Sequence, residues 1–238
     1  MLEVKNVSKQ YRGEDKLLFD AVSDVSLSME DHCIYALVGE SGCGKSTLSR
    51  LILGLEAPSS GQILLDGKPI SRKGARRRKE TAKAIQLVLQ DGKSALDPHF
   101  TVYQAIAEPI RNLLDLSKDK EQARVYELLD RMGLPKEAAK KKTGELSGGQ
   151  QKLVGLARGL SVNRNFFLLD EVTTGLDDHA VEKVMSYLLE MDQTLVLITH
   201  NLKYIDRMDH IILFDDGRVV ASGTYDEISK VWGELNEA

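Results

Sequence analysis

Residues 39–47 read GESGCGKST, three glycines followed by a lysine and two hydroxyl side chains. Glycines let several backbone N–H groups converge on one anion, and a helix that begins there adds its positive end. In such a loop Lys45 meets the β- and γ-phosphates of a nucleoside triphosphate, and Ser46 is a ligand for Mg²⁺. The stretch, called the P-loop below, therefore predicts a triphosphate site. Its expected contacts are Gly39, Ser41, Gly42, Cys43, Gly44, Lys45, Ser46 and Thr47.

Two adjacent carboxylates end the apolar run FFLLDE at 166–171. Ligands of open α/β sheets bind at the carboxyl ends of the strands, which is where the P-loop is expected. Asp170 suits the Mg²⁺ shell, and Glu171 is the candidate general base that polarises the attacking water. On its own this pattern is as well explained by a solvated turn; the P-loop makes it a prediction of hydrolysis.

Two further polar side chains end predicted strands, Gln90 after IQLVLQ and His200 after TLVLIT. Each could reach a γ-phosphate and is assigned to the catalytic group with Lys45 and Glu171. A single Gln or His in such a place is more often an ordinary loop residue. Both assignments therefore depend on the P-loop and the two carboxylates elsewhere in the sequence. The remaining histidines share no spacing and indicate no metal site.

A second glycine motif, LSGGQ at 146–150, opens a helix predicted over 148–160. Ser147 can cap that helix, and an apolar stripe at helical spacing follows it. The motif can be a polar helix start and no more, but its hydroxyl, glycine amides and helix dipole together make a second anion site.

Around these residues the chain alternates between strand and helix patterns. Residues 2–7 and 25–29 alternate apolar and polar side chains, as half-buried antiparallel strands do, whereas 33–38 is a continuous apolar run typical of a buried parallel strand. We predict an α/β P-loop NTPase fold with a mixed or parallel sheet, an antiparallel β subdomain and a helical insertion. The predicted domain is single, 1–238, with the core at 1–90 and 161–238 and the helical subdomain at about 91–160.

Composition excludes several classes of protein. The 238 residues carry a net charge of −4, which gives no basic field for nucleic acid, and the longest apolar runs are strand-sized. Cys33 and Cys43 form no CxxC motif, and the N-terminus lacks the apolar core of a signal peptide. We therefore expect a cytosolic chain whose membrane role, if it has one, depends on a partner.

The order of P-loop, Gln90, LSGGQ, LLDE, Gly175-Leu176-Asp177 and His200 resembles the ATP-binding subunits of ABC transporters over essentially the whole chain. The resemblance implies that Tyr11 stacks on adenine and that Gln90 is a ligand of Mg²⁺ and links it to the helical subdomain. It also implies that His200 contacts the γ-phosphate and that Asp177 lies at a dimer interface. It also implies ATP and Mg²⁺ as cofactors. The signature residues expected to close over the ATP of another subunit are Ser147, Gly148, Gly149 and Gln150.

The segment QDGKSALDPHFTV at 90–102 resembles the oligopeptide, dipeptide and nickel import ATPases, and the short stretch after GTYDEI favours the nickel or metal-chelate side. The implied partners are a second ATPase subunit, membrane permease subunits and, indirectly, an extracytoplasmic binding protein, with the chain at the cytoplasmic face of the membrane. An accessory ATPase of a multi-subunit enzyme, such as a phosphonate-degrading complex, is the alternative. A P-loop kinase leaves LSGGQ unexplained, and the interval from Gly39 to Leu146 is too short for the coiled coil of DNA-repair members.

Four places depart from the family pattern. Lys152-Leu153 replace Gln-Arg, Val172 replaces Pro, Thr174-Gly175 replace Ser-Ala, and Asn201 replaces Asp. None removes a group on which hydrolysis depends, and the hypothesis they favour is a member of an unequal ATPase pair.

Overall fold

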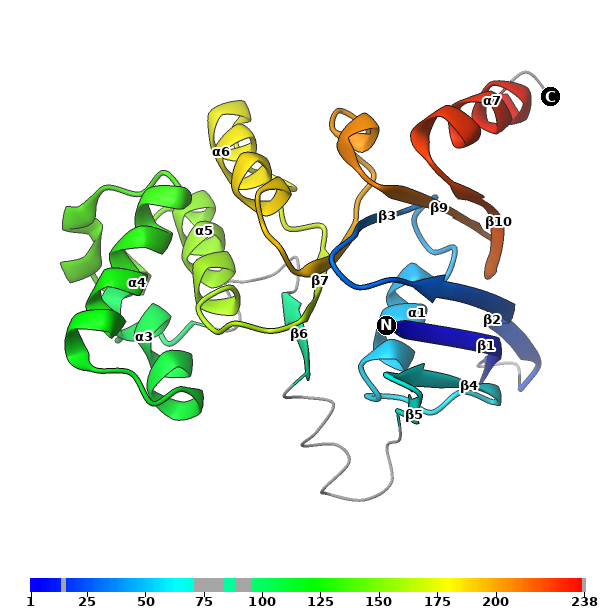
Figure 1. Cartoon of the computed structure of the whole chain (residues 1–238), viewed down its shortest axis with the longest axis horizontal. Helices are drawn as coiled ribbons and strands as arrows, with labels where there is room; N and C mark the ends of the chain where they lie inside the picture. The colour runs from blue at the N-terminus through cyan, green and yellow to red at the C-terminus, as the bar shows by residue number, and fades with distance from the viewer. Residues whose placement is uncertain (14–15, 71–83, 89–95, 237–238) are drawn as a thin grey trace. The chain divides into compact units, whose positions relative to one another are not determined.

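The computed structural model describes residues 1–13, 16–70, 84–88 and 96–236 (Figure 1). Gln90 and the segment that follows it to residue 95 lie outside the described residues. The chain forms two compact units. Unit 1 comprises Met1–Gln86, Asn165–Leu168 and Asp192–Ala238, and unit 2 comprises Leu87–Arg164 and Leu169–Met191.

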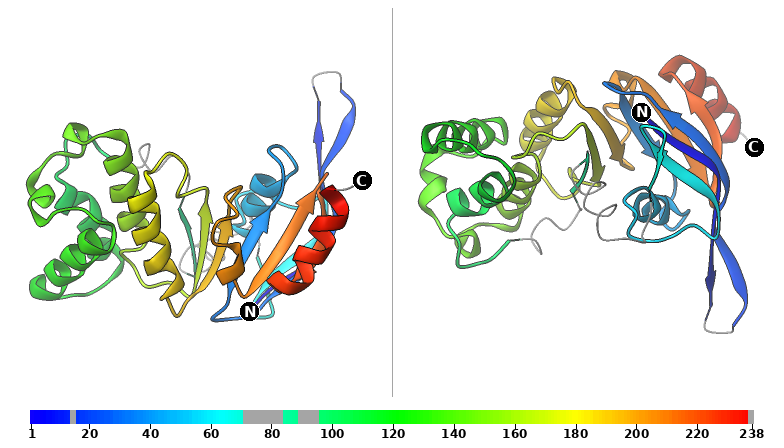
Figure 2. Two further views of the ribbon diagram at one scale, coloured as in Figure 1. Left: turned by 90° about the horizontal axis from the view of Figure 1, so that it is seen from above. Right: turned by 60° about the horizontal axis from the view of Figure 1, so that its bottom comes forward.

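An antiparallel sheet forms the first part of unit 1, in the order β2-β1-β4-β5. Its strands are β1 (Leu2–Arg12), β2 (Leu18–Met29), β4 (Ser60–Leu65) and β5 (Lys68–Pro69). Leu2, Val4 and Val7 are buried, as the alternating pattern predicted. Beyond Val7 the pairing with β2 shifts register twice, and the two strands continue as a projecting hairpin (Figure 2).

The second sheet has the order β10-β9-β3-β8-β7-β6. Its strands are β3 (Ile34–Val38), β6 (Ile85–Val88), β7 (Phe166–Asp170), β8 (Thr194–Ile198), β9 (His210–Asp215) and β10 (Arg218–Gly223). Strand β3 pairs in parallel with β8 and β9, while β9 and β10 are antiparallel. All five residues of β3 are buried, which explains its uninterrupted apolar run. The predicted α/β class with a mixed sheet and an antiparallel subdomain is confirmed.

Among its described residues, unit 1 has the helices α1 (Lys45–Ile52) and α7 (Tyr225–Asn236), with a 3₁₀ turn at Ile205–Arg207. Helix α1 follows β3 through the P-loop, as expected, and ends at Ile52. Helix α7 begins after Thr224, whose N–H donates to the Glu227 carboxylate at 2.8 Å. Across the part of the chain that the structure describes, no helix has the length and apolar character needed to cross a membrane.

Unit 2 is mainly helical, with α3 (Val102–Leu113), α4 (Lys118–Arg131), α5 (Gly148–Gly159) and α6 (Asp178–Leu189). Short 3₁₀ turns occupy Lys136–Lys140 and Thr143–Glu145. Side chains cap three of these helices: Thr101 caps α3, Ser147 caps α5 and Asp177 caps α6. The interior of the unit is apolar, and Ile106, Leu128 and Val154 are fully buried there.

One buried carboxylate links α3 to α4. Glu121 is 8% exposed and accepts two hydrogen bonds from Arg111, at 2.6 and 2.8 Å, and one from the Tyr103 hydroxyl at 2.9 Å. These donors, with Arg111 the largest cause, hold the pKa of Glu121 below its usual range. The carboxylate therefore stays ionised in the folded unit, and its donors stabilise the junction of the two helices.

We predict that Glu121→Gln lowers the free energy of unfolding at pH 7 by about 2 kcal/mol, since it removes charge-assisted hydrogen bonds. Because the folded pKa is lowered, this stabilisation is fully present above the unfolded pKa of about 4.3 and is lost as the pH falls towards the folded value. Urea denaturation at pH 7 and at pH 3.5 measures both effects. The control is Glu127→Gln, an exposed carboxylate on the same helix, which should change little; equal losses in the two variants would contradict the assignment.

Candidate functional site

The P-loop joins the buried end of β3 to the first turn of α1, and two backbone carbonyls press against its glycines. A Cβ placed on Gly39 would lie 1.9 Å from the Phe214 oxygen, and one on Gly44 would lie 2.2 Å from the Ala21 oxygen. Gly44 also has a φ of 110°, in the left-handed region that favours glycine. No other residue fits at either position, so the path of the loop is fixed by β2 and β9.

The start of α1 has no side-chain cap. Gly44 is its N-cap, and no side chain accepts a hydrogen bond from the first amides of the helix there. A Cβ on Gly42 would meet nothing within 4 Å, which leaves open space over the loop. Ser46 is exposed beside these amides. Open space, uncapped helix-start amides and a hydroxyl fit the triphosphate that the sequence predicts.

Lys45 lies almost wholly inside this loop, with 7% of its surface exposed. Its ammonium donates to the Gly39 oxygen at 2.8 Å and to the Glu40 oxygen at 2.6 Å. The charge is thus held over the loop by neutral acceptors. A bound phosphate offers the same ammonium a charged acceptor, and charge-assisted hydrogen bonds are roughly twice as strong as neutral ones.

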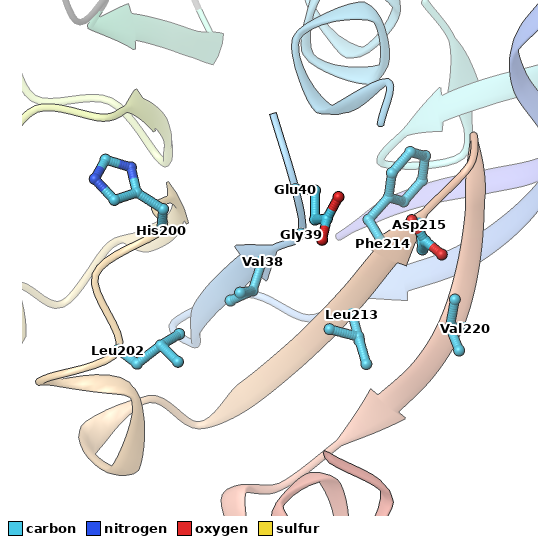
Figure 3. A pocket seen from close by; sticks show the side chains of 9 residues that line it. All are labelled: Val38, Gly39, Glu40, His200, Leu202, Leu213, Phe214, Asp215 and Val220. Atoms are coloured by element: carbon cyan, nitrogen blue, oxygen red, sulfur yellow. The ribbon is translucent and has the colours of Figure 1, made fainter. Parts of the chain in front are cut away.

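A pocket of about 520 Å³ adjoins the start of the P-loop (Figure 3). Its lining includes Gly39 and Glu40 of the loop and the exposed His200, which follows β8. The remaining lining is largely apolar: Val38, Leu202, Leu213, Phe214, Asp215 and Val220. The structure therefore brings His200 and the P-loop to one pocket, although 160 residues separate them in sequence.

Tyr11, the predicted adenine platform, is held by a carboxylate that the sequence analysis did not identify. Its hydroxyl donates to Glu56 at 2.5 Å, and the other Glu56 oxygen pairs with Arg50 of α1 at 2.9 Å. The Lys9 ammonium lies 5.1 Å from the ring centroid, and the Phe19 ring lies 5.8 Å away across the hairpin. The pKa of Glu56 is lowered, and the hydrogen bond from the Tyr11 hydroxyl is the largest cause. The Glu56 carboxylate is therefore an anion at neutral pH.

The two predicted carboxylates lie in unit 2, at the end of β7. Asp170 is the last residue of that strand, and Glu171 follows with a φ of 47°, an uncommon backbone angle for a residue with a side chain. The Thr174 hydroxyl donates to Glu171 at 3.4 Å. Both carboxylates are half-buried. The catalytic role of Glu171 stays a prediction.

The residues assigned to Mg²⁺ offer the donors that this ion prefers, a hydroxyl on Ser46 and a carboxylate on Asp170. Within the described ranges, no group of three or more His, Cys, Asp or Glu side chains gathers into a metal site. That fits an ion which has few protein ligands and completes its shell with phosphate oxygens and water. Gln90, the third assigned ligand, is among the residues that the structure does not describe.

The signature residues begin α5 in unit 2. The Ser147 hydroxyl accepts from the Gln150 N–H at 3.3 Å, and the Gln150 side chain accepts from the Ser147 N–H at 3.2 Å. This capping box bears out the helix start predicted at Ser147. Ser147 and Gly148 are exposed, and a Cβ on Gly148 would meet nothing within 4 Å. Asp177, also exposed, caps α6 by accepting from the Ala180 N–H at 2.9 Å.

The sequence model of one protein family, described as ABC transporter, matches residues 22–174 of the chain. The chain belongs to the ABC transporter family. The matched segment contains the P-loop, the signature and the two carboxylates after β7. The ABC ATPase hydrolyses ATP, with Mg²⁺ as the cofactor of that reaction.

Curated relatives of this ABC ATPase include proteins named for oligopeptide transport and for nickel import. It is 37% identical over 213 residues to the oligopeptide transport ATP-binding protein OppF of Lactococcus lactis subsp. lactis (strain IL1403), covering 87% of this chain and 67% of the relative. It is 37% identical over 204 residues to the nickel import ATP-binding protein NikE of Escherichia coli (strain K12), covering 84% of this chain and 76% of the relative.

Solved structures of ABC cassettes share its fold. A dimeric, post-hydrolysis structure of the cassette MJ0796 bound to ADP and Pi matches with a TM-score of 0.84 and 29% identity over 94% of this chain and 98% of that one. CbiO1 of Clostridium perfringens matches with a TM-score of 0.82, also at 29% identity, over 99% of this chain and 93% of that one. The P-loop NTPase architecture predicted from the sequence is thereby confirmed.

We predict that Gly44→Ala weakens ATP binding by at least about 100-fold, because the added Cβ forces the loop away from the Ala21 carbonyl and misplaces the amides of α1. Isothermal titration calorimetry with Mg²⁺ and ATP measures the dissociation constant. Gly67→Ala is the matched control: its φ of 71° carries a similar backbone cost, but a Cβ there meets nothing within 4 Å. Equal affinity losses in the two variants would mean that backbone strain, not the loop contact, is responsible.

Proposed function

We propose that this ABC ATPase powers an importer for nickel, a metal chelate or a small peptide through partner membrane subunits. The observation that carries the proposal is the similarity over more than four-fifths of the chain to OppF and NikE, whose names describe oligopeptide transport and nickel import. The chain supplies the hydrolysis, and the membrane subunits supply the path for the substrate. Residues 1–238 act as a single ABC ATPase domain.

In the proposed mechanism the P-loop binds the phosphates of ATP. The amides at the start of α1 and the Lys45 ammonium hold the phosphate oxygens, and the Tyr11 ring stacks on adenine. His200 contacts the γ-phosphate from the pocket that it shares with Gly39 and Glu40. Ser46, Asp170 and Gln90 would hold Mg²⁺, which would neutralise charge on the phosphate oxygens.

Glu171 is the proposed general base. It orients and polarises the water that attacks the γ-phosphorus, while the fixed donors of the P-loop stabilise the charge that develops on the phosphoryl oxygens. The support is its place directly after β7 and the Thr174 hydroxyl within 3.4 Å, which restrains the carboxylate.

The signature acts in trans. Ser147, Gly148, Gly149 and Gln150 lie at the start of α5 and close over ATP held by the P-loop of a second ATPase subunit, with Asp177 at the same interface. Ser147 and Gly148 are exposed. Support comes from the solved cassette MJ0796, which is dimeric. The departures at Lys152, Leu153, Val172, Thr174, Gly175 and Asn201 favour a partner that is homologous and not identical. We place the pair on permease subunits at the cytoplasmic face of the membrane, with an extracytoplasmic binding protein as an indirect partner and no nucleic acid.

We predict that Glu171→Gln retains ATP binding and lowers the hydrolysis rate by at least about 100-fold, as expected for loss of a general base. The variant should also accumulate a closed dimer with ATP, visible by size-exclusion chromatography. Glu190→Gln, an exposed carboxylate in the same unit, should hydrolyse ATP like the wild type. Undiminished hydrolysis by Glu171→Gln refutes the assigned base.

The importer role has a separate test. Affinity purification of the full chain from detergent-solubilised native membranes should recover a permease subunit and a second ATPase subunit. Recovery in a water-soluble enzyme complex that contains no membrane subunit would instead establish the accessory ATPase.

A further inference from the structure

Lys152 joins the signature helix to the turn that carries the proposed base. It lies on the second turn of α5, half-buried, and its ammonium donates to the Thr174 oxygen at 2.6 Å. Both residues belong to unit 2. Lys152 and Thr174 are both positions at which the chain departs from the family pattern, and they are in direct contact.

The turn from Glu171 to Asp177 has an unusual backbone. Glu171 has a φ of 47° and Gly175 a φ of 75°, and both lie in the left-handed region. Two backbone hydrogen bonds lie within the turn, from the Thr174 N–H to the Glu171 carbonyl at 3.1 Å and from the Leu176 N–H to the Thr173 carbonyl at 3.2 Å. A residue with a side chain at such a φ persists where its surroundings hold it there. The Lys152 ammonium is one such support.

Two glycines lie where the helix and the turn meet. A Cβ on Gly175 would lie 3.4 Å from the Lys152 ammonium, an ordinary van der Waals distance, which places the ammonium beside the turn backbone. A Cβ on Gly149 would lie 4.0 Å from a methyl group of Leu176, which places Leu176 beside the signature backbone. The contact thus has a polar part at Lys152 and an apolar part at Leu176.

We propose that Lys152 is a positioning residue that fixes the Glu171–Asp177 turn against the signature helix. The inference rests on the proposed roles of Glu171 and of the signature. Because α5 begins with residues that serve the ATP of the partner and the turn begins with the base that serves this chain's own ATP, the Lys152 contact makes the two move as one body. A displacement of the signature helix then also displaces Glu171, through the protein contact and not through the nucleotide.

The chemistry of the contact indicates which substitutions test it. Methionine retains the length and apolar stem of lysine but cannot donate to the Thr174 oxygen. Arginine retains a charged donor of similar reach. Lys140→Met is the matched control, since Lys140 is an exposed lysine in the same unit.

The experiment compares Lys152→Met, Lys152→Arg and Lys140→Met in the full chain. We expect Lys152→Met to lower kcat for ATP about tenfold, the effect of losing roughly one charge-assisted hydrogen bond that the transition state needs, with KM for ATP unchanged. Amide hydrogen exchange should become faster in peptides covering 171–177 and stay unchanged in α4. Lys152→Arg should restore slow exchange and most of kcat, and Lys140→Met should behave as the wild type.

Unchanged exchange in 171–177, or an unchanged kcat, in Lys152→Met overturns the inference. Faster exchange throughout unit 2 also overturns it, because the lysine would then stabilise the whole unit and not the turn. Glu171→Gln, measured beside these variants, separates the two levels: if it hydrolyses ATP normally, the proposed function fails, whereas if only Lys152→Met is normal, the positioning role alone fails.

Discussion

The approach of two backbone carbonyls to the P-loop is the constraint on which unit 1 depends. The Phe214 and Ala21 oxygens occupy the space that side chains would need at Gly39 and Gly44, so strands β9 and β2 set the path of the loop. The Gly217 N–H adds a hydrogen bond to the Cys43 oxygen at 2.8 Å, from the turn between β9 and β10. The loop is therefore shaped before any ligand arrives, and its amides need little rearrangement to hold an anion.

In unit 2 two of the side chains that cap helices, Ser147 and Asp177, are also proposed to face a partner. Ser147 and Asp177 each satisfy a backbone N–H at a helix start and remain exposed. Their geometry is fixed by local hydrogen bonds that exist without the partner. Assembly of the ATPase pair then requires little ordering of these residues, which reduces the entropy cost of association.

Local features were predictable from the sequence, and contacts between distant segments were not. The strand at β3 and the helix cap at Ser147 each depend on neighbouring residues and appear as predicted. Strands β1 and β2 extend well beyond the predicted 2–7 and 25–29, because shifts in register interrupt their alternation. The Tyr11–Glu56 bond joins residues 45 apart, and no spacing rule indicates it. No spacing rule indicates the approach of the Ala21 carbonyl to Gly44 either, although it excludes a side chain there.

The Glu56 carboxylate connects the two ends of the proposed nucleotide site. One oxygen accepts from Tyr11 on the hairpin, and the other pairs with Arg50 on α1, the helix that begins at Lys45. The aromatic platform for the base and the cradle for the phosphates thus share an anchor. The Glu56 anchor therefore fixes the distance between the Tyr11 ring and the P-loop. A ligand that has phosphates alone, or a base alone, can contact only one of these two parts.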